Sequence, residues 1–157
     1  MAKATFAAGS FWQAEEAFRH LPGIIGTTVG YMGGTVSNPT YEDVAGGHTG
    51  HALVVEVEFD PVHIEYINLL EVFWTCHDPT SLNRQGKDEG TQYRSAIFFH
   101  NMEQKEVALE SRRQEQTLHR RQIVTEIVPV AEFYPAEKMH QQYLEQHGLV
   151  GSPVAVE

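Results

Sequence analysis

Hydrophobic and polar positions repeat along this chain with two periods, which predict strands and helices in turn. Residues 4–8 form a short apolar run that predicts a buried strand. Residues 10–21 then carry apolar side chains at helical spacing, and Pro22-Gly23 ends the run. Ser10, with Gln13 three residues later, has the pattern of a capping box. We therefore expect a strand and then a helix that begins at Ser10.

The rest of the chain continues this alternation. Residues 51–59 alternate between apolar side chains and glutamates, which is typical of a half-buried strand. The pattern further predicts strands over residues 24–32, 95–100 and 123–130, helices over 64–77, 102–121 and 136–147, and long polar loops over 33–50 and 80–91. This order predicts an α+β fold, with helices packed on a central mixed β-sheet in a ferredoxin-like two-layer core.

The composition of the chain indicates the size of the domain, its net charge and its cellular compartment. A chain of 157 residues, 41% of them hydrophobic, is long enough for one core. We expect one domain over residues 1–147 and a C-terminal tail over 148–157. The net charge of −10 argues against nucleic acid and anionic membranes as partners. No apolar run approaches the roughly 20 residues of a membrane span, and the first residues are too polar for a signal peptide. The single cysteine, Cys76, cannot form an internal disulfide, so we expect a cytoplasmic protein. We also expect a monomer.

The turn between the first strand and the first helix is the first candidate site. A side chain at a helix N-terminus lies near free backbone amides and the positive end of the dipole. A cysteine there would be an activated nucleophile, whereas the hydroxyl of Ser10 stays protonated without an adjacent base. Taken alone, Ser10 fits a plain capping residue better than a catalytic one. Phe11 and Trp12 follow directly, and one of them is expected to line a pocket, ordinary packing on both sides being the alternative.

Several short segments together resemble a known family. They are Gly9-Ser10-Phe11-Trp12, Gly30-Tyr31-Met32-Gly33-Gly34, Asn38-Pro39-Thr40-Tyr41, Thr49-Gly50-His51-Ala52, His77-Asp78-Pro79-Thr80, Arg84-Gln85-Gly86 and Gly90-Thr91-Gln92-Tyr93-Arg94-Ser95-Ala96-Ile97. In order and in spacing, these segments resemble the motifs of methionine sulfoxide reductase A, and the likeness runs from about residue 4 to residue 143. No single tetrapeptide carries it.

The resemblance implies a reaction and a set of roles. The family reduces the S epimer of methionine sulfoxide, free or in proteins, through a cysteine that becomes a sulfenic acid. A resolving cysteine and then thioredoxin or a similar thiol restore it, and no other cofactor is implied. By the motifs, Tyr41 and Tyr93 would donate hydrogen bonds to the sulfoxide oxygen, and Asp88 would help to bind the methionine backbone. Phe11 and Trp12 would hold the S-methyl group. Taken singly, the tyrosines also fit packing roles, and Asp88 fits a turn.

Two positions depart from the family pattern. Ser10 stands where the family has its nucleophilic cysteine, and a serine oxygen cannot supply the two electrons that sulfoxide reduction requires. Leu53 stands where the family has the glutamic acid that protonates the oxygen, although leucine also suits the apolar face of its strand. Cys76, near the C-terminal end of a helix, fits a small buried residue better than a replacement nucleophile. We therefore expect a pocket that binds its substrate and is inactive as a reductase.

Three explanations fit these departures. The chain is an engineered reductase with serine in place of cysteine, which is the favoured account of Ser10. Alternatively, it is a natural relative that persists as a non-catalytic module binding methionine or its sulfoxide, or it acts on another sulfoxide, with Leu53 widening the apolar wall. Two other classes of protein, metal-dependent enzymes and nucleotide-binding proteins, fit the sequence less well. The spacing of His48 and His51 matches no metal-ligand pattern, and Gly86-Lys87 lacks the following Ser or Thr of a phosphate-binding loop.

Overall fold

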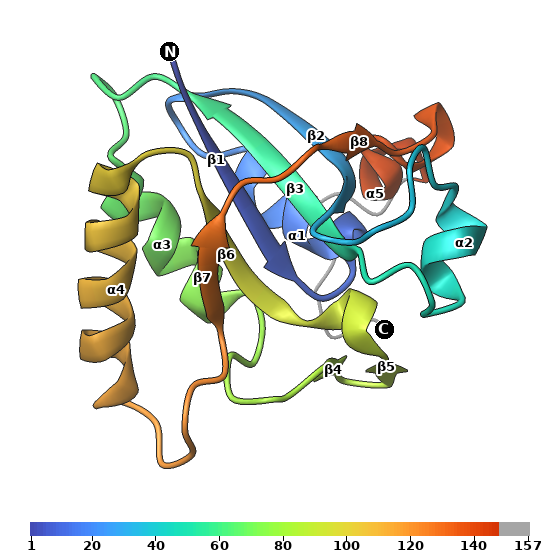
Figure 1. The fold of residues 1–157 in the computed structure, drawn as a ribbon. Coiled ribbons are helices and arrows are strands. Elements are labelled where there is room, and N and C mark those ends of the chain that lie inside the picture. The colour runs from blue at the N-terminus through green and yellow to red at the C-terminus, as the bar shows by residue number, and fades with distance from the viewer. Residues whose placement is uncertain (148–157) are drawn as a thin grey trace.

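A six-stranded sheet forms the centre of the structure, a computed structural model that describes residues 1–147 (Figure 1). Its strand order is β7-β6-β1-β3-β2-β8. Neighbouring strands run antiparallel except β6 and β7, which are parallel, so the sheet is mixed as predicted. The strands are β1 (Ala2–Ala8), β2 (Ile24–Met32), β3 (Ala52–Phe59), β6 (Ser95–Phe99), β7 (Glu126–Pro129) and β8 (Tyr134–Pro135).

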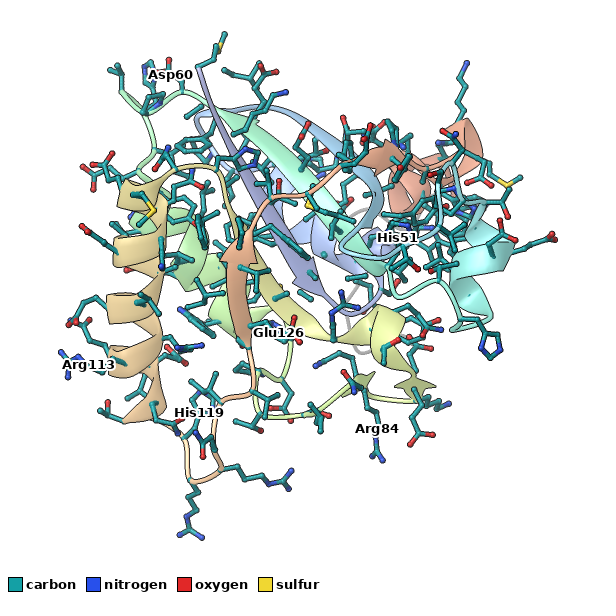
Figure 2. The ribbon with its side chains drawn as sticks, viewed as in Figure 1. His51, Asp60, Arg84, Arg113, His119 and Glu126 are labelled. Atoms are coloured by element: carbon teal, nitrogen blue, oxygen red, sulfur yellow. The ribbon has the colours of Figure 1, made fainter. Side chains whose placement is uncertain are left out.

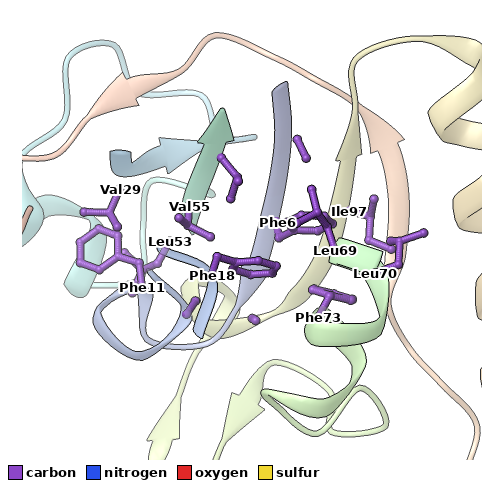
Figure 3. Packing of buried hydrophobic residues seen from close by; sticks show 14 of the residues in the cluster. Phe6, Phe11, Phe18, Val29, Leu53, Val55, Leu69, Leu70, Phe73 and Ile97 are labelled. Carbon is purple, nitrogen blue, oxygen red and sulfur yellow. The ribbon is translucent and has the colours of Figure 1, made fainter. Parts of the chain in front are cut away.

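Two helices cover one face of this sheet and complete the predicted two-layer α+β fold. Helices α1 (Phe11–Arg19) and α3 (Tyr66–Thr75) bury their apolar sides in the main core, and α4 (Met102–Gln116) packs against α3 (Figure 3). Phe6 on β1 stacks with Phe18 of α1 at 5.1 Å and with Phe73 of α3 at 5.3 Å between ring centroids. The shorter elements are α2 (Tyr41–Ala45), β4 (Arg84–Gln85), β5 (Asp88–Glu89), η1 (Thr91–Tyr93), η2 (Lys138–His140) and α5 (Tyr143–Gln146).

The opposite face of the sheet is also covered, which corrects the expectation of a half-buried strand over residues 51–59. Ala52 and Val54 on β3 are fully buried in a second, smaller cluster. Val130 and Phe133, from the segment that joins β7 to β8, pack over this cluster. Figure 1 shows that segment crossing the sheet on the side opposite α1. Periodicity could not reveal this cover, because it comes from residues about eighty positions away.

Two loop expectations also need correction. The loop over residues 33–50 contains α2, which begins with a capping box: the Thr40 hydroxyl accepts from the Asp43 amide, and the Asp43 carboxylate accepts from the Thr40 amide. The segment over 80–91 contains the β4–β5 hairpin. Helix α4 ends at Gln116 instead of residue 121. The Gln116 side chain donates to the Arg121 carbonyl and accepts from the Ile123 amide, so it turns the chain back early.

The predicted helix over residues 136–147 is wrong. Only η2 and the single turn α5 are helical there. The Gln141 side chain accepts from the Val29 amide and donates to the Val29 carbonyl, both at 2.9 Å, and the Gln142 backbone amide donates to Glu15 at 2.8 Å. These contacts hold the segment along the edge of β2, and Gln142 adopts a left-handed conformation with φ of 49°.

The tail predicted over residues 148–157 lies outside the described residues. Within residues 1–147, no helix has the length and apolar character needed to cross a membrane.

Candidate active site

The turn from β1 into α1 places Ser10 beside the β4–β5 hairpin. Gly9 has a φ of +87°, and a Cβ there would lie 2.8 Å from Cγ of Gln85, so both the turn and the hairpin contact require glycine. Ser10 occupies the N-cap position, but its side chain makes no capping hydrogen bond, so the predicted capping box is wrong. Ser10 instead lines a hollow of about 120 Å³. The other residues lining this polar hollow are Ala8, Gln13, Cys76, His77, Gln85, Gly86 and Asp88.

His77 is the group in the polar hollow that could act as a base, and it is already engaged. Its Nδ1–H donates to the Phe73 carbonyl at 2.7 Å, so Nε2 is left to accept from the Ser95 hydroxyl at 2.7 Å. Ser95 also bonds Thr125 at 2.7 Å. Burial lowers the pKa of His77 to about 4, so the ring stays neutral near pH 7. Because both nitrogens are occupied, His77 does not activate Ser10.

Cys76 also borders the polar hollow, at the C-terminal end of α3. Its thiol donates to the Phe73 carbonyl at 3.5 Å, and the side chain packs against the main core. Burial raises the pKa of Cys76 to about 12. The thiolate, which is the reactive form of cysteine, is therefore scarce at neutral pH. This agrees with the interpretation of Cys76 as a small buried residue.

Phe11 and Trp12, directly after Ser10, begin an aromatic cluster. Phe11 is 1% exposed, and Trp12 lies between the core and the surface. The Trp12 indole stacks on Tyr143 at 4.0 Å between centroids, and its N–H donates to Nδ1 of His140 at 3.2 Å. Tyr41 stacks on His140 at 4.3 Å. The aromatic cluster thus comprises Phe11, Trp12, Tyr31, Tyr41, His140 and Tyr143.

Sequence reasoning missed three residues in or beside the aromatic cluster: Glu137, His140 and Tyr143. The Glu137 carboxylate accepts from the Tyr31 hydroxyl at 2.8 Å and from the Tyr41 amide at 3.1 Å, and it thereby ties α2 to β2. These contacts join residues about a hundred positions apart in the chain. A local pattern carries no signal for them.

The structure brings Tyr41, Tyr93 and Asp88 together, as the motifs suggest. Burial raises the pKa of Tyr41, and the neighbouring Tyr93 and Asp88 raise it further. Burial likewise raises the pKa of Tyr93, with Asp88 adding to the effect. Both phenols therefore remain protonated hydrogen-bond donors near neutral pH. Asp88 also lines the polar hollow, so it connects the two tyrosines with Ser10.

Leu53 lies in the core directly behind the aromatic cluster. It is paired with Tyr31 across β2 and β3 and is 2% exposed. Figure 3 shows it beside Phe11, within the same group of packed side chains. A carboxylic acid at this position would lose most of its hydration, which would raise its pKa and favour the protonated form. Leucine supplies no proton and extends the apolar surface under Phe11.

His51, one of the two histidines considered as metal ligands, has other partners. His51, labelled in Figure 2, accepts from the Gly34 amide at 2.9 Å through Nδ1 and bonds the Val36 carbonyl at 2.7 Å through Nε2. Both ring nitrogens therefore fasten the loop after β2 to the start of β3. Among residues 1–147, no three side chains of His, Cys, Asp or Glu are grouped so that they could hold a metal ion.

Comparison with known proteins shows the family and the fold. Residues 2–153 match the family described as peptide methionine sulfoxide reductase. The enzyme MsrA of Methanothermobacter thermautotrophicus is 59% identical over 147 residues, covering 92% of this chain and 87% of the relative. MsrA of Geobacter sulfurreducens is 57% identical over 148 residues, covering 93% and 91%. The crystal structure of reduced Mxr1 from Saccharomyces cerevisiae has a TM-score of 0.90 at 35% identity and covers 94% of this chain and 86% of that one. This chain belongs to the peptide methionine sulfoxide reductase family.

Proposed function

We propose that this chain is a methionine-S-sulfoxide reductase scaffold that binds its substrate at the start of α1 and does not turn it over, because Ser10 occupies the position of the nucleophile. The proposal rests on the placement of Ser10 at the N-cap of α1 within the polar hollow. The groups around Ser10 retain substrate recognition, whereas the step that consumes electrons is lost.

The electron balance explains the inactivity. Reduction of a sulfoxide to methionine needs two electrons, which an attacking thiolate provides when its sulfur gains the oxygen and becomes a sulfenic acid. The oxygen of Ser10 has no corresponding oxidation step. Cys76 does not replace it, because its pKa of about 12 keeps the thiol protonated. Leu53 removes the acid that would protonate the departing oxygen.

The remaining groups support binding. The hydroxyls of Tyr41 and Tyr93 are protonated donors suited to the sulfoxide oxygen, and the nearby Asp88 suits the amino group or backbone of methionine. Phe11 and Trp12 offer apolar ring surface to the methyl group. We assign recognition to these five residues and the lost chemistry to positions 10 and 53, all within one domain of residues 1–147.

The reductant of an active form would be an external thiol. The Mxr1 protein of Saccharomyces cerevisiae has been solved in complex with Trx2, and that structure has a TM-score of 0.65 at 27% identity to this chain. A thioredoxin-like protein is therefore the partner we assign to the active form. A non-catalytic module that binds methionine or its sulfoxide is the function left when the thiol is absent.

Restoring both missing groups tests the proposal. We expect Ser10→Cys with Leu53→Glu to reduce the S epimer of methyl sulfoxide substrates with dithiothreitol, and to leave the R epimer unreduced. The unaltered chain and the matched control Ser10→Ala with Leu53→Glu should show no turnover. Circular dichroism would confirm that the variants keep the fold, since Leu53→Glu introduces an acid into the core. Multiple turnovers by the unaltered chain, or an inactive but folded double reversion, would refute the assignment.

A further inference from the structure

Glu15 on α1 is a buried carboxylate that is not among the residues assigned to substrate recognition. It is 1% exposed, although a carboxylate is costly to bury without hydrogen bonds. Three donors satisfy it: the Thr27 hydroxyl at 2.7 Å, the Gln142 backbone amide at 2.8 Å and the Gln142 side-chain amide at 2.6 Å. Burial raises the pKa of Glu15, whereas these hydrogen bonds favour its charged form. Glu15 thus fastens the C-terminal segment to the first helix.

This attachment holds an unusual backbone conformation at Gln142. Its φ of 49° and ψ of 45° lie in the left-handed region, which is unfavourable for a residue other than glycine unless surrounding contacts maintain it. The Gln142 side chain bonds Glu15 and also the Thr27 carbonyl, the latter at 3.2 Å. These bonds stabilise the bend by which the chain leaves the edge of β2 and enters α5.

The residues on either side of this bend supply two rings of the aromatic cluster. Tyr143, directly after the bend, stacks on Trp12 at 4.0 Å between centroids. His140, two residues before it, accepts the Trp12 N–H at 3.2 Å and stacks on Tyr41 at 4.3 Å. The bend therefore lies between the two residues that support the rings assigned to the methyl group and the sulfoxide oxygen.

Helix α1 carries the indole and the attachment on one side. Trp12, Glu15 and Arg19 follow one another at helical spacing, so their side chains leave the helix on the same face. Arg19 forms an ion pair with Glu145 of α5 at a partly exposed position, where such pairs contribute little. Hydrogen bonds to a buried carboxylate are stronger, so Glu15 is the stronger of these two attachments between α1 and the C-terminal segment.

We propose that Glu15 is a positioning residue for substrate recognition and acts by holding the bend at Gln142. The bend keeps His140 and Tyr143 in contact with Trp12, so that the indole presents a fixed face to the methyl group of the substrate. This inference rests on the proposed binding of methionine sulfoxide at the aromatic cluster. Glu15 itself contacts no part of the substrate in this assignment and acts only through the rings.

The affinity for methionine sulfoxide, measured by titration calorimetry, tests this role. We expect Glu15→Ala to raise Kd by about tenfold, and Glu15→Gln, which keeps one accepting oxygen and the shape of the side chain, to raise it less. In a chain that already carries His140→Ala with Tyr143→Ala, either change at Glu15 should alter Kd by less than about twofold, because the rings through which it acts are absent.

The matched control is Gln104→Ala. This side chain is 6% exposed and fastens α4 to β1 by donating to the Lys3 carbonyl at 2.8 Å. Figure 1 shows α4 on the opposite side of the molecule from α5. Gln104→Ala therefore removes a comparable buried attachment and should leave Kd unchanged.

The fluorescence of Trp12 gives a second measurement that needs no substrate. The chain has two tryptophans, so Trp12 is the only one left in a Trp74→Phe background. Its emission reports the stack with Tyr143. We expect Glu15→Ala and, to a smaller extent, Glu15→Gln to shift this emission to longer wavelength, and Gln104→Ala to leave it unchanged. Circular dichroism establishes that the compared variants are folded.

Two results would overturn the proposal. The first is unchanged Trp12 emission in the folded variants at Glu15, because the bend would then hold without the carboxylate. The second is a rise in Kd that is equal for the Glu15 and Gln104 variants, or equal with and without the two rings, because the effect would then be general destabilisation. If the unaltered chain binds no methionine sulfoxide while the emission shifts as expected, the proposed function fails and the placement of the rings by Glu15 is supported.

Discussion

The aromatic cluster, which begins at Phe11, and the polar hollow, which Ser10 lines, are stabilised in different ways. In the aromatic cluster, rings from α1, α2 and the C-terminal segment contact one another directly, as Trp12 and Tyr143 do at 4.0 Å. In the polar hollow, the side chains bond the surrounding backbone and other side chains. His77 bonds Phe73 and Ser95, and Gln85 bonds both backbone groups of Asp78.

Under the assignment proposed above, this difference explains how the pocket keeps its shape without a thiol at position 10. The aromatic cluster depends on many ring contacts, none of which involves the atom at position 10. The polar hollow keeps its walls because His77 and Gln85 are satisfied without Ser10. A serine in place of a cysteine at position 10 would therefore remove the electron donor and leave the packing almost unaltered, since a hydroxyl and a thiol are similar in size.

The largest effect is expected from the centre of the aromatic cluster. Phe11→Ala removes a ring that is 1% exposed and contacts Tyr31, Tyr41 and His140, so the free energy of unfolding should fall by about 3–5 kcal/mol. Urea denaturation followed by fluorescence measures it. Trp12→Phe, at a partly exposed position, is the milder control. A cost below about 1 kcal/mol for Phe11→Ala would show that the cluster is not a packing unit.

The polar hollow should respond to pH through His77. Its folded pKa of about 4 lies below the ordinary value of 6.5, so the unfolded chain takes up the proton first as the pH falls. The stabilisation is complete above pH 6.5 and is lost as the pH falls to 4, by about 3 kcal/mol. Denaturation midpoints across this window measure it, with His77→Gln as the comparison. An equal slope in both proteins would exclude His77 as the source.

The smallest effect concerns the link between the two regions. Tyr93→Phe should weaken binding of methionine sulfoxide to the unaltered chain by about 1 kcal/mol, or about fivefold in Kd, through one lost hydrogen bond. Titration calorimetry measures it, and Tyr134→Phe on β8 is the matched control outside the candidate site. An unchanged Kd in Tyr93→Phe would remove this residue from the site.

Sequence reasoning succeeded where the determinants are neighbours in the chain. The apolar run and glycine before Ser10 predicted the strand–turn–helix, and the motifs around Tyr41, Asp88 and Tyr93 predicted side chains that do come together. It failed where distant segments meet. The residues around Gln141 and Gln142 have a pattern that predicts a helix. The side chains of both glutamines nevertheless form hydrogen bonds with β2, and Gln142 also bonds Glu15. Tertiary hydrogen bonds there override local helix propensity.

The capping box predicted at Ser10 also failed because another segment of the chain packs against this residue. Ser10 and Gln13 fit the capping-box pattern, but Ser10 faces the polar hollow, which the β4–β5 hairpin closes from the other side. Thr40 and Asp43 have a similar pattern and do form the box, at the exposed start of α2. The same short motif thus has different outcomes, depending on whether another segment packs against it.

The two glutamines beside β2 also bear on how the molecule behaves in concentrated solution. Strand β8 is only two residues long, so within residues 1–147 most of the outer border of β2 has no strand beside it. Gln141 satisfies both backbone groups of Val29, and Gln142 satisfies the carbonyl of Thr27, much as an adjoining strand would. A border occupied in this way offers little to an incoming chain, which protects the protein from edge-to-edge aggregation.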